Sequence, residues 1–261
     1  MKIDKRMAIV VCAALFSAAV CAQTIVAVSA ESTPRARREP RAKDKNRESG
    51  LFGDHWWANR FLSKQNEIEK LRGKKVDLVL LGDSIMHFWE RKHKDSWAKL
   101  TANRTVLNLG YGGDRTQHVL WRIDHGELDG YEAKCIVLMI GTNNNSSKDT
   151  KPENVAAAIE KIVAGIRRHQ PNAKIVLHPI FPRGDSAQSE RHAAARGRND
   201  RTNELLKKFA DRDGRITWID FNDKLVDETG WVPKSIMADQ IHPTDAGYDL
   251  WMEALAPVIG K

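Results

Sequence analysis

The chain has 261 residues, of which 41% are hydrophobic and eight are tryptophan, so its composition excludes a disordered chain and can supply one domain with a large core. The formal net charge is +8, but three basic and one acidic residue lie in 1–30, and seven basic and four acidic residues lie in 31–50, which leaves +3 for residues 51–261. A charge this small argues against a nucleic acid as partner.

Residues 1–30 have the pattern of a secretory signal peptide. A basic start with Lys2, Lys5 and Arg6 precedes an apolar run, and small residues follow at two sites that fit a cleavage signal. The same apolar run is nearly long enough for an uncleaved membrane anchor, and this alternative stays open. We expect cleavage, a secreted or periplasmic location, and no stable membrane insertion of the cleaved chain.

Residues 31–50 are charged, contain two prolines and lack large apolar side chains. Such a segment cannot bury enough surface to order itself, so we predict a disordered tether, followed by a catalytic domain over 51–261. Cys135 is the only cysteine beyond residue 30. A chain cleaved there forms no intramolecular disulfide and offers no cysteine-based metal site.

From residue 51 onwards, segments with the pattern of strands alternate with segments that have helical spacing. The predicted strands are 76–81, 105–109, 135–140, 174–180 and 216–219. The predicted helices are 57–71, 90–100, 115–128, 152–169, 199–211 and 244–258. The strands are almost continuously apolar, which indicates a five-stranded parallel sheet covered by helices on both faces. In such sheets, ligands bind beyond the carboxyl ends of the strands.

Polar residues at those strand ends supply the parts of an acyl-transfer site. Ser84 follows the first strand, and a serine hydroxyl becomes a good nucleophile only when a base takes its proton. His242, just before the last helix, is the candidate base. Asp239, three residues earlier, can hold the imidazole in the required tautomer. The Ser84 and Gly113 N–H groups and the Asn143 side-chain amide are candidate donors to an oxyanion.

Each of these motifs taken alone is more often structural. The Gly-Asp-Ser sequence around Ser84 can cap a helix, and the glycines around Gly113 can form an ordinary turn. Asn143 alone is an ordinary loop residue, and an aspartate three residues before a histidine is common. The other helix and loop histidines are expected at the surface: His87, His93, His118, His125 and His169. The four motifs together, in this order and at these strand ends, are far more specific than any one of them.

With these motifs, the sequence resembles the SGNH (GDSL) hydrolase family over roughly residues 76–255. The stretches "NLGYGGDRTQHVLWRI", "IGTNNN" and "FPRG" are similar to the subgroup around the catalytic subunits of platelet-activating-factor acetylhydrolase, to which many bacterial carbohydrate acetyl esterases are related. The resemblance implies a three-layer α/β/α flavodoxin-like fold. It also implies Ser84 as nucleophile, His242 as base, Asp239 as its orienting carboxylate, and an oxyanion hole from Ser84, Gly113 and Asn143.

One position departs from the commonest family pattern, because Asn144 stands where Gly-x-Asn-Asp has an aspartate. The acetylhydrolase-like subgroup shares the asparagine, so the departure indicates the subgroup rather than a loss of activity. We therefore expect a serine esterase without metal or cofactor that hydrolyses short acyl esters, above all acetyl esters of carbohydrates. The alternatives are a lysophospholipase or short-chain lipid esterase, and a non-catalytic carbohydrate-binding protein. Relatives of this kind include dimers, so a homodimer is a further expectation.

Overall fold

The structure is a computed structural model that describes residues 56–186 and 188–259. The predicted signal peptide over 1–30 and the predicted tether over 31–50 lie outside these described residues. The domain boundaries drawn from the sequence therefore stay predictions.

The chain divides into two compact units, Met1–Ser63 and Lys64–Lys261. The described part of the first unit is the beginning of helix α2 (Trp56–Lys70), where the rings of Trp57 and Phe61 stack with their centroids 6.0 Å apart. The second unit contains the sheet and all the residues of the predicted site.

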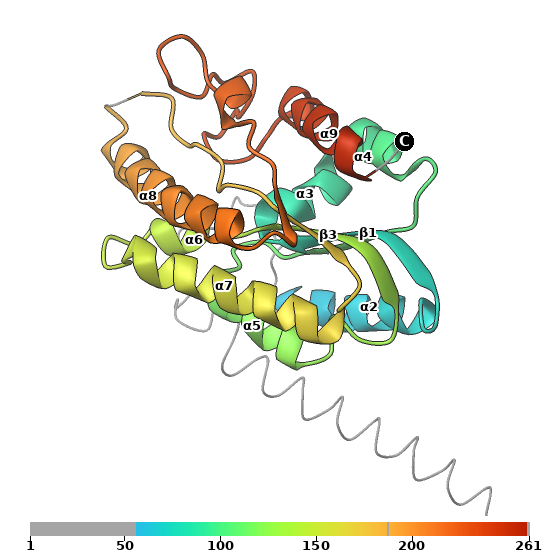
Figure 1. Ribbon diagram of the computed structural model, residues 1–261. Coiled ribbons are helices and arrows are strands. Elements are labelled where there is room, and N and C mark those ends of the chain that lie inside the picture. The colour runs from blue at the N-terminus through green and yellow to red at the C-terminus, as the bar shows by residue number, and fades with distance from the viewer. Residues whose placement is uncertain (1–55, 187, 260–261) are drawn as a thin grey trace, which may run out of the picture. The chain divides into compact units, whose positions relative to one another are not determined.

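The sheet has five parallel strands in the order β2-β1-β3-β4-β5, which confirms the predicted α/β class (Figure 1). The strands are β1 (Lys75–Gly82), β2 (Val106–Gly110), β3 (Glu132–Met139), β4 (Lys174–Leu177) and β5 (Ile216–Trp218). All five were predicted from their apolar runs. β4 ends three residues before its predicted end, because the chain leaves the sheet after Leu177.

The helices begin and end close to their predicted bounds in most cases. They are α3 (Ser84–Lys92), α4 (Lys94–Thr101), α5 (Thr116–Asp124), α6 (Thr142–Asn145), α7 (Pro152–His169), α8 (Glu190–Arg212), the 3₁₀ helix η2 (Asn222–Leu225) and α9 (Asp245–Ile259). Two predictions were wrong in extent. The single helix predicted over 90–100 is the pair α3 and α4, and α8 begins nine residues before the predicted residue 199.

Helices cover both faces of the sheet and form two separate cores (Figure 1). Side chains of α5, α7 and α8 pack on one face, and those of α3, α4 and α9 pack on the other. Alternate residues of β1 serve the two cores: Val79 and Leu81 point into the first, Leu78 and Leu80 into the second. This period of two in a strand buried on both faces explains why β1 reads as a continuous apolar run.

The carboxyl ends of the strands are packed closely against the first turn of α3. A Cβ added at Gly82 would lie 2.4 Å from the Met139 carbonyl oxygen, and one added at Gly110 would lie 2.4 Å from the Met86 Cβ. Real Cβ atoms do not approach other heavy atoms so closely, so both positions require glycine. The glycines thus allow the chain to turn directly from β1 into the helix that carries Ser84.

Candidate active site

Ser84 is the first residue of α3 and follows β1 after a turn of only one residue, Asp83. The Asp83 side chain caps the helix by accepting a hydrogen bond from the Ile85 N–H at 3.0 Å. The Ser84 hydroxyl lies 2.8 Å from Nε2 of His242, which comes from the loop before α9. The turn therefore presents the hydroxyl at the carboxyl end of the sheet and against an imidazole.

Asp239 completes a line of three side chains. Its Oδ2 lies 2.6 Å from Nδ1 of His242, and its Oδ1 accepts the backbone N–H groups of Ile241 at 3.1 Å and of His242 at 2.7 Å. Burial acts to raise the pKa of Asp239, but these hydrogen bonds outweigh it and hold the pKa well below its ordinary value. The carboxylate is thus ionised and fixes both the ring orientation and the Nδ1–H tautomer of His242.

Contacts with residues outside the loop fix the position of the loop that carries Asp239 and His242. Gln240 has a φ of +67°, an uncommon conformation for a residue other than glycine. Its carbonyl accepts the Gly184 N–H at 3.1 Å, and the Phe88 ring of α3 lies against the His242 ring with the centroids 4.8 Å apart. These contacts place the imidazole without involving its two nitrogens.

The predicted oxyanion donors Gly113 and Asn143 are connected to each other through Asp114. The Asn143 amide donates to the Asp114 carbonyl at 2.9 Å, and Gly113 has a φ of +78°, which favours glycine. Within 56–186 and 188–259, the N–H groups of Ser84 and Gly113 have no hydrogen-bond acceptor. Ser84 lies in the first turn of a helix, where N–H groups lack intrahelical partners and are available to an anion.

Three consecutive asparagines fix the short helix α6 to three different parts of the site. Asn143 reaches Asp114, as described above. Asn144 accepts the Thr116 N–H at 3.0 Å and donates to the Thr116 hydroxyl at 3.1 Å, at the start of α5. Asn145 is fully buried and donates to Asn199 and Thr202 of α8. The asparagine at 144 can both accept and donate, which an ionised aspartate at that position could not do.

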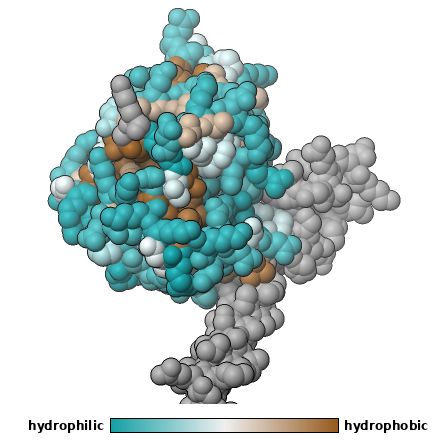
Figure 2. Space-filling model, turned by 90° about the vertical axis from the view of Figure 1, so that its right-hand side faces the viewer, coloured by the Kyte–Doolittle hydropathy of each residue, from teal (hydrophilic) through white to brown (hydrophobic). Residues whose placement is uncertain are grey.

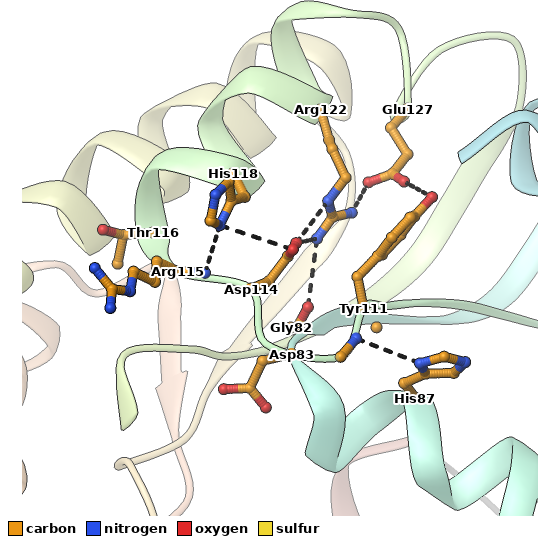
Figure 3. Close-up of polar contacts among 12 residues, drawn as sticks. Gly82, Asp83, His87, Tyr111, Asp114, Arg115, Thr116, His118, Arg122 and Glu127 are labelled. Atoms are coloured by element: carbon orange, nitrogen blue, oxygen red, sulfur yellow. Dashed lines mark hydrogen bonds and ion pairs between the residues drawn. The ribbon is translucent and has the colours of Figure 1, made fainter. Parts of the chain in front are cut away.

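A buried ionic cluster that no sequence motif predicts lies beneath the site (Figure 3). Arg122 of α5 donates through Nε to the Asp114 carboxylate at 3.0 Å and through Nη1 to Glu127, and its Nη2 lies 3.3 Å from the Gly82 carbonyl oxygen. The Tyr111 hydroxyl donates to Glu127 at 2.5 Å. Arg122 thereby connects the end of β1, just before Ser84, to the loop that carries Gly113.

Two histidines expected at the surface support the same loop. His87 is 3% exposed, and its Nδ1 accepts the Gly112 N–H at 3.3 Å (Figure 3). His118 accepts the Arg115 N–H at 2.9 Å, and burial, with the charges of Arg122 and Arg115, lowers its pKa to about 4. Both predictions were wrong, because helical spacing alone does not show which helix face meets a neighbouring loop.

Asp83 gives this site a testable pH dependence. Burial raises the pKa of Asp83 to about 6, although the Ile85 N–H and the charges of His242 and Arg183 oppose the shift. The folded state therefore binds this proton more tightly than the unfolded state, and the free energy of unfolding falls as the pH rises from about 4 to about 6. Asp83→Asn keeps a capping oxygen without the charge.

We expect the wild type to lose stability relative to Asp83→Asn between pH 4.5 and pH 7.0. Urea unfolding of both proteins at the two pH values measures this difference. Because all other titrating groups are shared, the comparison isolates residue 83. A difference in stability that stays constant across the two pH values would contradict the assignment.

Within the described residues, no group of three or more His, Cys, Asp or Glu side chains could hold a metal ion. No described helix has the length and apolar character that a membrane span requires.

A parallel sheet that presents a hydrogen-bonded serine, histidine and aspartate beside free N–H groups has the arrangement of serine ester hydrolases. The family model "GDSL-like Lipase/Acylhydrolase family" matches residues 80–250. The chain belongs to this family of SGNH hydrolases, as its motifs suggested, and it is a carboxylic ester hydrolase that acts on a small-molecule ester.

Curated relatives agree with this assignment. The chain is 34% identical over 191 residues to the platelet-activating factor acetylhydrolase IB subunit alpha2 of Rattus norvegicus, covering 73% of this chain and 79% of that protein. It is 32% identical over 177 residues to the subunit alpha1 of Pongo abelii, covering 68% of this chain and 72% of that protein.

Solved structures share the fold. A GDSL-like lipase from Bacteroides thetaiotaomicron is similar with a TM-score of 0.64 and 18% identity, over 76% of this chain and 96% of that one. An acetyl xylan esterase is similar with a TM-score of 0.54 and 17% identity, over 69% of this chain and 97% of that one.

The relatives correct one prediction. The curated relatives are intracellular acetylhydrolase subunits, which contradicts the secreted or periplasmic location predicted from residues 1–30. That prediction depended on a basic start and an apolar run, and such a composition does not by itself establish export.

Proposed function

We propose that Ser84 is the nucleophile, His242 the general base and Asp239 the carboxylate that orients it. The observation that carries this proposal is the line of two hydrogen bonds, 2.8 Å from Ser84 to His242 and 2.6 Å from His242 to Asp239. A nearly buried serine hydroxyl that lies against an imidazole, which a carboxylate fixes in turn, is the arrangement that activates a serine nucleophile.

The reaction follows from this geometry. As the Ser84 Oγ attacks the ester carbonyl carbon, His242 Nε2 takes the hydroxyl proton, and Asp239 stabilises the imidazolium. The carbonyl oxygen becomes an anion, which the N–H groups of Ser84 and Gly113 and the Asn143 amide stabilise. His242 then protonates the leaving alcohol, and the acyl group stays on Ser84 until water, activated by the same imidazole, releases it.

We further propose that the acyl group is short and is acetyl in the natural substrate. The names of the relatives support this, since they include acetylhydrolase subunits and an acetyl xylan esterase. On the face drawn in Figure 2, hydrophobic residues form a narrow band between hydrophilic ones, whereas docking on lipid would use a broad apolar surface.

For the alcohol half of the ester, we propose a carbohydrate. A cavity of about 340 Å³ lies beside Asn144, next in sequence to the oxyanion donor Asn143, and would hold a more distant part of the carbohydrate, because Ser84, His242 and Arg183 do not line it. Its lining is almost entirely polar or charged: Arg115, Thr116, Gln117, Asn144, Asp149, Thr150, Lys151 and Asn154, with Val155 as its apolar member. Hydroxyl, amide and charged groups of this kind can replace the water around a hydroxyl-rich alcohol.

A short-chain lipid ester is the alternative, because solved relatives include a protein named as a lipase. A non-catalytic carbohydrate-binding protein would gain nothing from the Ser84, His242 and Asp239 line. The homodimer predicted from the resemblance stays a prediction.

The chain-length dependence of hydrolysis tests the proposed function. We expect kcat/KM to be at least tenfold higher for 4-nitrophenyl acetate than for 4-nitrophenyl octanoate. Release of 4-nitrophenolate, followed by absorbance at fixed pH, gives both values. Faster hydrolysis of the octanoate would favour the lipid ester, and the absence of turnover above the buffer rate would contradict an esterase.

A further inference from the structure

Arg183 is a buried cation, and it has no anionic partner in the part of the chain that the structure describes. Its side chain is only 3% exposed, and it lies in the segment between β4 and α8. Nη1 donates to the Ser146 hydroxyl at 2.7 Å and to the Thr142 hydroxyl at 3.3 Å, and Nε donates to Nδ1 of His192 at 3.3 Å. All of these acceptors are neutral, and no carboxylate of the described residues lies within 4 Å of the guanidinium.

Arg183 lies next to two parts of the candidate active site. Its bonds to Thr142 place it beside the helix that carries Asn143, and the next residue, Gly184, holds the loop of His242 by donating to the Gln240 carbonyl. Arg183 therefore lies between α6 and the loop that carries His242. The third guanidinium nitrogen, Nη2, has no acceptor among residues 56–186 and 188–259.

The surrounding charges leave this guanidinium incompletely neutralised. Burial and the positive charges of Arg191 and Arg198 lower the pKa of Arg183 to about 10, and only the more distant Asp83 and Asp239 act in the opposite direction. The side chain is still protonated at neutral pH. A buried guanidinium is costly unless an anion pairs with it, so the site is suited to a negatively charged ligand.

Building on the proposed function, we propose that Arg183 Nη2 binds a carboxylate on the alcohol half of the ester. The alcohol half is indicated because the residue after Arg183, Gly184, bonds to the loop of His242, the group that protonates the leaving alcohol. A singly charged group fits better than a phosphate dianion, because Asp83 and Asp239 lie within electrostatic range of the same guanidinium. The substrate class is thus an acyl ester of a hydroxy acid, such as an acidic sugar.

A pair of matched esters tests this specificity. We compare kcat/KM for 3-acetoxybenzoate and for the neutral 3-acetoxybenzamide, each divided by the rate at which hydroxide hydrolyses that ester. For the wild type we expect the value for the benzoate to be about tenfold or more above the value for the benzamide. A hydrogen bond between charged groups stabilises the transition state by enough to give at least about a tenfold difference in rate. In Arg183→Met, the ratio should fall to about one. Arg183→Lys should retain part of it, because the charge is kept.

Arg201→Gln is the matched control, since it removes one positive charge from an exposed position of α8 that is paired with Glu153 and Glu204. Its ratio should equal that of the wild type. If Arg183 only anchored the local structure, Arg183→Met would slow the hydrolysis of both esters equally and leave their ratio unchanged. The ratio therefore separates a role in specificity from a purely structural role. Equal rates on both esters in the wild type would overturn the inference but leave the esterase intact, whereas no hydrolysis of either would contradict the proposed function itself. A preference for 3-acetoxyphenyl phosphate over the carboxylate would overturn the choice of a carboxylate.

Discussion

Replacement of Ser84 by alanine is expected to lower kcat/KM for 4-nitrophenyl acetate by roughly 10⁴- to 10⁶-fold, as in serine hydrolases that lose a triad member. The substitution removes the hydroxyl that lies 2.8 Å from His242 Nε2, so no acyl-enzyme can form at this position. Activity should not vanish entirely, because the N–H donors and the imidazole remain and can still assist attack by water. The measurement is 4-nitrophenolate release at protein concentrations high enough to detect the residual rate.

Two controls make this result specific. Ser63→Ala, an exposed position in α2, should keep wild-type activity. A fluorophosphonate should add one phosphonyl group to the wild type, located at Ser84 by peptide mass, and none to Ser84→Ala. A Ser84→Ala protein that retains more than about a hundredth of wild-type activity would mean that another residue is the nucleophile.

The fold was largely predictable because its strands are buried on both faces. Uninterrupted apolar runs such as 76–81 and 135–140 have few structural alternatives, and the amphipathic pattern over 152–169 predicted α7 with its observed bounds. The first two turns of α8 were missed because that stretch is rich in charged residues and alanine and lacks apolar periodicity. α3 was missed at its start because a serine after a strand equally well begins a loop.

The site was predictable only in part, for a physical reason. Ser84, Asp239 and His242 are visible in the sequence because the chemistry proposed for them requires those residue types near strand ends. Residues that position them are not restricted in this way. His87 supports Gly112 from 25 residues away, and Arg183 contacts Thr142 across 41 residues, so each depends on how the helices and loops pack.

Replacement of Arg122 by methionine is expected to lower the free energy of unfolding by about 3–5 kcal/mol, the usual cost of removing one partner from a buried ion pair. Arg122, Asp114 and Glu127 are all fully buried, so the substitution removes the Arg122 charge from two buried carboxylates (Figure 3). A domain of this size is typically stable by only about 5–15 kcal/mol. Urea unfolding at neutral pH, followed by tryptophan fluorescence, measures the loss.

Comparison with two further variants distinguishes the loss of charge pairing from the loss of packing. Arg122→Lys keeps the charge but not the three-way contact to Asp114, Glu127 and the Gly82 carbonyl, so it should lose less stability than Arg122→Met. Glu127→Gln keeps one acceptor oxygen for Arg122, and its amide N–H can donate to the Tyr111 hydroxyl instead of accepting from it, so this variant should be milder still. If Arg122→Met does not fold, the order of Arg122→Lys and Glu127→Gln still tests the prediction. A methionine variant within 1 kcal/mol of the wild type, or a glutamine variant less stable than the lysine variant, would show that the cluster's charges do not stabilise this part of the protein.

Because Arg122 connects the chain before Ser84 to the loop of Gly113, variants that still fold should also show a lower kcat at an unchanged KM.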